Sequence, residues 1–116
     1  MRHFHFYYLE KFCKMICKLN MTQRGERLKA IFVKIFGHVQ GVGFRYFTYR
    51  IAKKLKITGY VRNAEDGTVE IHAEGDDQTL ERFLSEVSRG PTMAIVTDVR
   101  IEEVPIEGYR DFDIVH

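Results

Sequence analysis

The stretch GHVQGVGFR, residues 37–45, decides the fold, because an apolar segment typical of a β-strand precedes it and a helical pattern follows it. We call residues 37–45 the glycine loop. Its three glycines, Gly37, Gly41 and Gly43, allow a tight turn and a close approach of the backbone to a ligand. At such a junction the first N–H groups of the helix are free, and the helix dipole adds positive potential. With Arg45 in the first helical turn, the loop is suited to an anion such as phosphate, although a plain strand-to-helix connection would look similar.

Hydrophobic periodicity on both sides of the glycine loop predicts an α+β domain. The expected elements are strands at residues 28–36, 57–63, 68–74 and 93–104, a helix directly after the loop, a second helix capped by Asp76 or Asp77, and a short edge strand near residues 109–114. The Asp66-Gly67 pair predicts a hairpin turn between the second and third strands. Two right-handed crossovers then give a ferredoxin-like βαββαβ sandwich, with an antiparallel sheet and two helices on one face.

Residues 68–74 alternate between apolar and polar side chains, as a strand with one buried face does. The inward side chains are expected to be Val69, Ile71 and Ala73, and the outward ones Glu70, His72 and Glu74. We therefore predict that His72 faces solvent and is neither a ligand nor a base.

The chain of 116 residues is long enough for one domain with a hydrophobic core, and it has no apolar run that could span a membrane. Both cysteines, Cys13 and Cys17, lie near the start, so the rest of the chain has no disulfide framework, which favours a reducing, cytoplasmic location. We expect residues 1–27 to be an extension and linker that is disordered or non-essential, with Met21 as the functional start. The domain itself is expected at residues 28–116.

Charge is distributed unevenly along the chain. Residues 27–64 hold nine Lys or Arg and no Asp or Glu, whereas residues 65–116 hold four Lys or Arg and fourteen Asp or Glu. The basic half contains the glycine loop and suits a small anionic substrate. The basic half also leaves open another function, RNA binding on the sheet. The chain has, however, no basic-Gly-aromatic run typical of RNA-recognition motifs.

Two motifs give the chain a resemblance to the acylphosphatase family. Residues 35–45, IFGHVQGVGFR, are similar to the first signature of that family at every defined position, and residues 59–75, which begin GYVRNAEDGTV, are similar to the second. The resemblance covers about residues 28–116. It implies a ferredoxin-like fold and an enzyme that hydrolyses acyl phosphates to a carboxylate and inorganic phosphate, without a cofactor.

The same resemblance implies roles for individual residues. It makes Arg45 and Asn63 catalytic: Arg45 grips two phosphoryl oxygens as a fork, and Asn63 orients the attacking water. The implied phosphate-binding residues are Gln40, Gly41, Val42, Gly43, Phe44 and Arg45, the first five through backbone N–H groups. From the residues alone Arg45 stands out, whereas Asn63 resembles an ordinary turn residue. We interpret His38 as incidental.

The residue types in these motifs suit an acyl phosphate. The glycine loop has no Ser, Cys or Asp nucleophile, and no cluster of carboxylates and histidines accompanies it as a metal site. The leaving group of an acyl phosphate is a carboxylate, whose conjugate acid has a pKa of about 4, so no proton donor is needed. We expect a monomer that binds phosphate as product and competitive ligand, and no nucleic-acid or membrane partner. The alternative is a non-catalytic acylphosphatase-like module that binds phosphate or carbamoyl phosphate.

Overall fold

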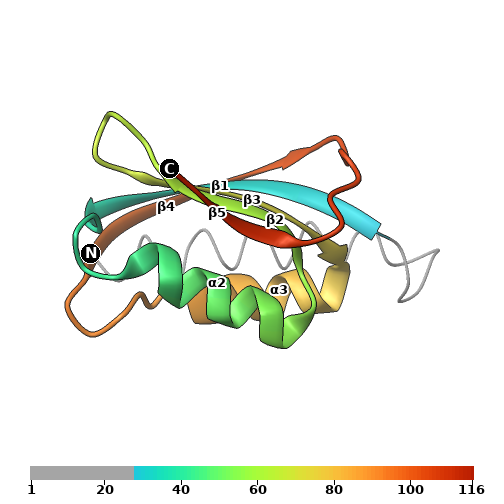
Figure 1. Cartoon of the computed structure of the whole chain (residues 1–116), viewed down its shortest axis with the longest axis horizontal. Coiled ribbons are helices and arrows are strands. Elements are labelled where there is room, and N and C mark those ends of the chain that lie inside the picture. The colour runs from blue at the N-terminus through green and yellow to red at the C-terminus, as the bar shows by residue number, and fades with distance from the viewer. Residues whose placement is uncertain (1–27) are drawn as a thin grey trace.

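The computed structural model describes residues 28–116, and Figure 1 shows two helices against one face of a sheet. The strands are β1 (Leu28–His38), β2 (Thr58–Asn63), β3 (Val69–Asp76), β4 (Ile95–Val104) and β5 (Phe112–Val115), and the helices are α2 (Phe44–Leu55) and α3 (Asp77–Val87). The prediction of a ferredoxin-like α+β sandwich is confirmed. The expected extension at residues 1–27, with both cysteines, lies outside the described residues.

One strand pairing differs from the expected antiparallel sheet. The strand order is β4-β1-β3-β2-β5, and β5 runs parallel to β2 while the other three pairings are antiparallel. The connection at residues 105–111 leaves β4 at one edge and crosses to the opposite edge, so β5 starts at the end of the sheet where β2 starts. Since β1 and β2 are both antiparallel to β3, the carboxyl ends of β1, β2 and β5 meet at one end of the sheet.

The core lies between the sheet and the helices. The buried face of α2 is formed by Phe44, Thr48, Ile51 and Ala52. In α3 the expected cap is Asp76, whose Oδ1 accepts a hydrogen bond from the backbone N–H of Thr79 at 2.8 Å. The buried stripe of that helix is formed by Leu80, Phe83, Leu84 and Val87. No helix within residues 28–116 is long and apolar enough to cross a membrane.

The prediction that His72 faces solvent is wrong. Alternation along β3 does place His72 and Glu74 on the face away from the helices, but residues 105–111 cross that face and cover them, leaving His72 3% exposed. His72 Nε2 lies 2.7 Å from Glu74 Oε2, and its ring packs 5.2 Å from the ring of Tyr109. Burial favours a higher pKa for Glu74, but hydrogen bonds from His72 and from the backbone N–H groups of residues 107–109 outweigh it and lower that pKa.

Candidate active site

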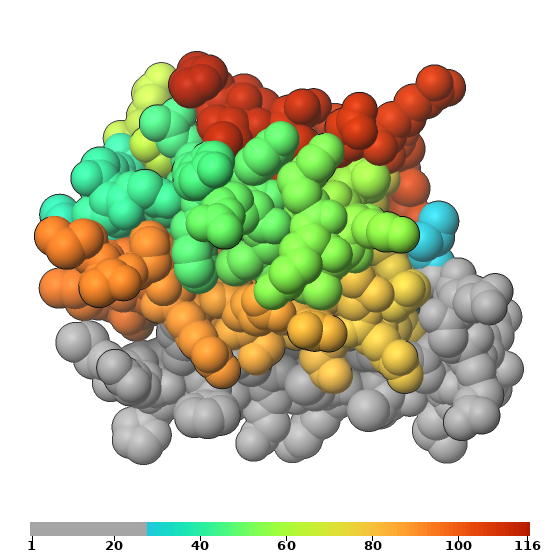
Figure 2. All heavy atoms as spheres, turned by 60° about the horizontal axis from the view of Figure 1, so that its bottom comes forward, coloured from blue at the N-terminus to red at the C-terminus, as the bar shows by residue number. Residues whose placement is uncertain are grey.

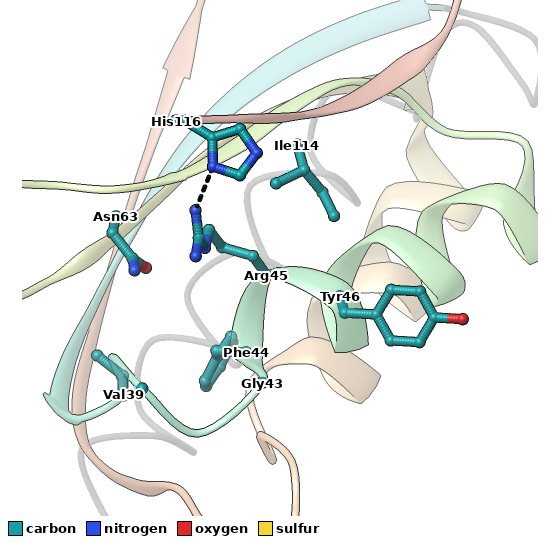
Figure 3. A pocket seen from close by; sticks show the side chains of 9 residues that line it. Val39, Gly43, Phe44, Arg45, Tyr46, Asn63, Ile114 and His116 are labelled. Atoms are coloured by element: carbon teal, nitrogen blue, oxygen red, sulfur yellow. Dashed lines mark hydrogen bonds between the residues drawn. The ribbon is translucent and has the colours of Figure 1, made fainter.

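A pocket of about 260 Å³ opens at the end of the sheet where β1, β2 and β5 finish. Its lining comes from the glycine loop, the start of α2 and the ends of β2 and β5 (Figure 3), and consists of Val39, Gly41, Gly43, Phe44, Arg45, Tyr46, Asn63, Ile114 and His116. The pocket thus brings together five of the predicted site residues, namely Gly41, Gly43, Phe44, Arg45 and Asn63. Two others, Gln40 and Val42, do not line it: Val42 packs against the core.

The backbone of the glycine loop lies open to the pocket. Gly41 and Gly43 have φ angles of 76° and 81°, a left-handed conformation that residues with side chains rarely adopt. A Cβ at either position would meet no atom of residues 28–116 within 4 Å. Gly43 caps α2, and the first helical bond recorded there runs from the N–H of Phe47 to the carbonyl of Gly43 at 3.0 Å. Within residues 28–116 the N–H groups of the first turn therefore have no acceptor, and no acidic side chain occupies that turn. This is an anion-binding end of a helix.

The side chain of Gln40 joins the glycine loop to the hairpin between β2 and β3. Its Nε2 donates to the carbonyl oxygens of Ala64 and Thr68, at 2.8 and 2.9 Å. Asn63 immediately precedes this hairpin, and Arg45 is the last residue of the glycine loop. The two hydrogen bonds therefore fix the loop that carries Arg45 relative to the strand end that carries Asn63. This part of the site, a side-chain clamp, was not foreseen from the sequence.

Asn63 is the last residue of β2, and its amide points into the pocket (Figure 3). Because side chains alternate along a strand, Asn63 lies on the same face as the fully buried Val61, toward the helices. Its Oδ1 is buried and accepts no hydrogen bond from any residue in the range 28–116. A buried acceptor without a partner is costly, so this oxygen is suited to a water or ligand in the pocket.

Arg45 projects from the first turn of α2 into the same pocket. Its Nη1 lies 3.1 Å from Nδ1 of His116, directly after β5. Within residues 28–116 no carboxylate lies within salt-bridge distance of Arg45. The guanidinium charge is therefore available to an anion on the glycine loop.

The nearby acidic hairpin is held by other partners. Lys34 Nζ lies 2.7 Å from Asp66, and the hydroxyl and backbone N–H of Thr68 donate to Asp66 Oδ1 at 2.6 and 3.1 Å. The hydrogen bond from Lys34, followed by those from Thr68, holds the pKa of Asp66 well below its usual range. Gly67 adopts the left-handed conformation expected of the turn, with a φ of 90°. In the described part of the chain, no group of three or more His, Cys, Asp or Glu could hold a metal ion.

Comparison with known proteins agrees with this arrangement. The sequence model of the acylphosphatase family matches residues 31–114. An acylphosphatase of Thermotoga petrophila is 58% identical over 87 residues, which are 75% of this chain and 97% of the relative. An acylphosphatase of Archaeoglobus fulgidus is 47% identical over 87 residues, covering 75% of this chain and 98% of that protein.

Solved structures show the same fold. The crystal structure of acylphosphatase from Bacillus subtilis superposes with a TM-score of 0.74 at 42% identity, over 78% of this chain and all of that one. Full-length HypF, crystallised in a phosphate- and nucleotide-bound form, superposes with a TM-score of 0.75 at 36% identity, but the match covers 81% of this chain and only 12% of HypF. By family model, relatives and structure alike, this chain belongs to the acylphosphatase family.

Proposed function

We propose that this chain hydrolyses acyl phosphates to a carboxylate and inorganic phosphate, by attack of water on a phosphoryl group held in the pocket. The family assignment supports the reaction, and the meeting of the glycine loop, Arg45 and Asn63 in one pocket supports the mechanism. That meeting is the observation on which the proposal rests.

The glycine loop and Arg45 hold the phosphoryl group. Free N–H groups at the loop and the start of α2 donate to its oxygens, and the helix dipole favours its negative charge. Arg45 adds a bidentate grip from the same turn of the helix. The phosphoryl transition state is loose and spreads charge over these oxygens, so fixed donors stabilise it without moving.

Asn63 positions the nucleophile. Its buried Oδ1, which has no partner among residues 28–116, accepts a hydrogen bond from a water molecule. This bond turns the oxygen lone pair of that water toward phosphorus. The water oxygen bonds to phosphorus as the bond from phosphorus to the acyl oxygen breaks. The electron pair of that bond leaves on the carboxylate, and a proton of the water passes to a phosphoryl oxygen. No protein group has to gain or lose a proton.

Turnover of benzoyl phosphate in the presence of EDTA tests this proposal. We expect full activity with EDTA, because Arg45, the loop and Asn63 supply all the contacts invoked. Loss of turnover in EDTA that Mg²⁺ restores would contradict the mechanism.

The same assay tests a second candidate, a binding module without turnover, which the likeness to a 12% portion of HypF favours. That candidate predicts phosphate binding by calorimetry and no release of benzoate. Release of benzoate by the folded protein, reduced by about 10²-fold or more in the Asn63→Ala variant, would exclude it.

We further propose that residues 28–116 form the active unit and that the protein acts as a cytoplasmic monomer. The pocket residues named above, including Arg45 and Asn63, lie within this range. A chain that starts at Met21 and elutes at monomer size with full activity would agree, whereas loss of folding or activity would place the boundary elsewhere.

A further inference from the structure

His116 lies at the pocket because β5 runs parallel to β2. Val115 pairs with Arg62, so the next residue, His116, comes level with Asn63. Alternation puts His116 on the face of Phe112 and Ile114, the face that packs against α2. Figure 2 shows the red atoms of the last residues lying against the green atoms of α2.

The contact between His116 and Arg45 defines the protonation of the imidazole. An arginine side chain has five N–H donors and no acceptor, so at 3.1 Å Nη1 of Arg45 donates and Nδ1 of His116 accepts. Nδ1 therefore carries no proton, and the ring is in the neutral tautomer with its proton on Nε2. A protonated ring, with a hydrogen on both nitrogens, would face Arg45 with two donors and two positive charges.

We propose that His116 is a positioning residue for Arg45, a role that rests on the proposed function. The hydrogen bond occupies Nη1 on one side of the guanidinium and restrains the rotation of a long, flexible side chain. Of the four N–H groups that remain, the one on Nε and one on Nη2 form the parallel pair that binds two oxygens of a phosphoryl group. His116 thus holds the fork toward the glycine loop before the substrate arrives, which lowers the ordering cost of binding.

Three variants test this role, each measured by calorimetry with inorganic phosphate at pH 8, where an imidazole is ordinarily neutral. His116→Phe keeps a ring but removes the acceptor, and should weaken phosphate binding about threefold to tenfold, the worth of one hydrogen bond. His116→Gln keeps an acceptor oxygen and should recover most of this loss. Val115→Phe is the matched control, since it puts the same ring on the opposite face of β5, and it should bind as the parent does.

A double-mutant cycle separates positioning from a general structural effect. If His116 acts through the guanidinium, His116→Phe should change phosphate binding less than twofold in an Arg45→Lys background. If His116→Phe still weakens phosphate binding by about the full threefold to tenfold in the Arg45→Lys background, the proposal is overturned. Equal phosphate binding by His116→Phe and the parent would also overturn it. The ¹⁵N spectrum of the ring gives a third readout: a neutral ring with its proton on Nδ1 contradicts the assigned tautomer.

These measurements need no turnover. If the parent protein fails to hydrolyse benzoyl phosphate while the binding cycle and the ring spectrum behave as described, the proposed function is wrong and the role of His116 stands. If hydrolysis is normal and the cycle shows no coupling, the proposed function stands and the role of His116 is wrong.

Discussion

Replacing Gln40 by alanine tests how the site is held together. The substitution removes two hydrogen bonds, to the carbonyl oxygens of Ala64 and Thr68. A typical hydrogen bond contributes about 0.5–1.5 kcal/mol to the free energy of unfolding, so the pair sets a range of about 1–3 kcal/mol.

The structure indicates that Gln40→Ala lowers the free energy of unfolding by an amount near the lower end of that range. Each carbonyl keeps a backbone partner after the substitution, since Ala64 accepts from the N–H of Gly67 at 3.2 Å and Thr68 from the N–H of Ala64 at 2.9 Å. Neither oxygen is left unpaired, so the full penalty for a buried orphan acceptor does not apply. We expect a loss of about 1–1.5 kcal/mol, which lowers the Tm of a domain of this size by about 4–12 °C.

The activity of Gln40→Ala should fall more than its stability suggests. Without the clamp the glycine loop can shift relative to the strand end that carries Asn63, and a displacement near 1 Å can reduce a rate by about 10²-fold. We expect kcat/KM for benzoyl phosphate to drop at least about tenfold at a temperature where the variant is fully folded. Gln78→Ala, at an exposed position of α3, is the control and should stay within about 0.5 kcal/mol of the parent.

Two results would refute this reasoning. A variant that melts about 4–12 °C lower but keeps kcat/KM within twofold of the parent shows that the clamp stabilises the hairpin without setting the site. A variant with unchanged melting and unchanged kinetics shows that neither hydrogen bond contributes.

Three further predictions concern Arg45, Gly43 and Glu74. Arg45→Lys keeps the charge but loses the pair of parallel N–H groups of the guanidinium, so kcat/KM for benzoyl phosphate should fall by about 10²-fold or more. Near-normal kinetics would mean that the backbone alone binds the phosphoryl group. Gly43→Ala forces a residue with a side chain into a φ of 81°, at a cost of about 1 kcal/mol, and should lower the Tm by about 4–8 °C. The protein should still fold, because a Cβ there meets no atom of residues 28–116 within 4 Å; an unchanged Tm would contradict the strain. Glu74→Gln should lower the free energy of unfolding in urea by about 1–3 kcal/mol at pH 7. The pKa of Glu74 is lowered in the folded state. The stabilisation by its carboxylate is therefore present above the unfolded pKa of about 4.3 and is lost as the pH falls through the lower folded value. A difference in the free energy of unfolding between Glu74→Gln and the parent that persists at lower pH would refute this.

Much of the fold could be predicted from local patterns. Alternation and helical periodicity depend on a few neighbouring residues, and they indicated each element. The helix cap was narrowed to Asp76 or Asp77, and the structure has Asp76. The direction of β5 could not be predicted, because it depends on where residues 105–111 carry the chain after β4. Residues 105–111 are also the reason why the prediction for His72 was wrong. Alternation identifies the face of the sheet on which His72 lies, but it does not show which segment covers that face.

The site was predicted in part for the same reason. Arg45 and the glycines stand in one short stretch, so their chemistry is visible in the sequence. Asn63 could be singled out only through the resemblance to the family, because an asparagine before a hairpin is common. His116 was missed, and alternation of Phe112, Ile114 and His116 would have revealed its face only if the direction of β5 had been known.

The most direct test of the account measures phosphate binding and turnover on one folded variant, Asn63→Ala. In the proposed mechanism the glycine loop and Arg45 hold the phosphoryl group while Asn63 holds the water, so inorganic phosphate should bind within about twofold of the parent by calorimetry. Turnover of benzoyl phosphate should fall by about 10²- to 10³-fold, the usual effect of losing one positioned contact in the transition state. Binding and turnover that fall together would make Asn63 a ligand of the phosphoryl group, and turnover that does not fall would remove it from the mechanism.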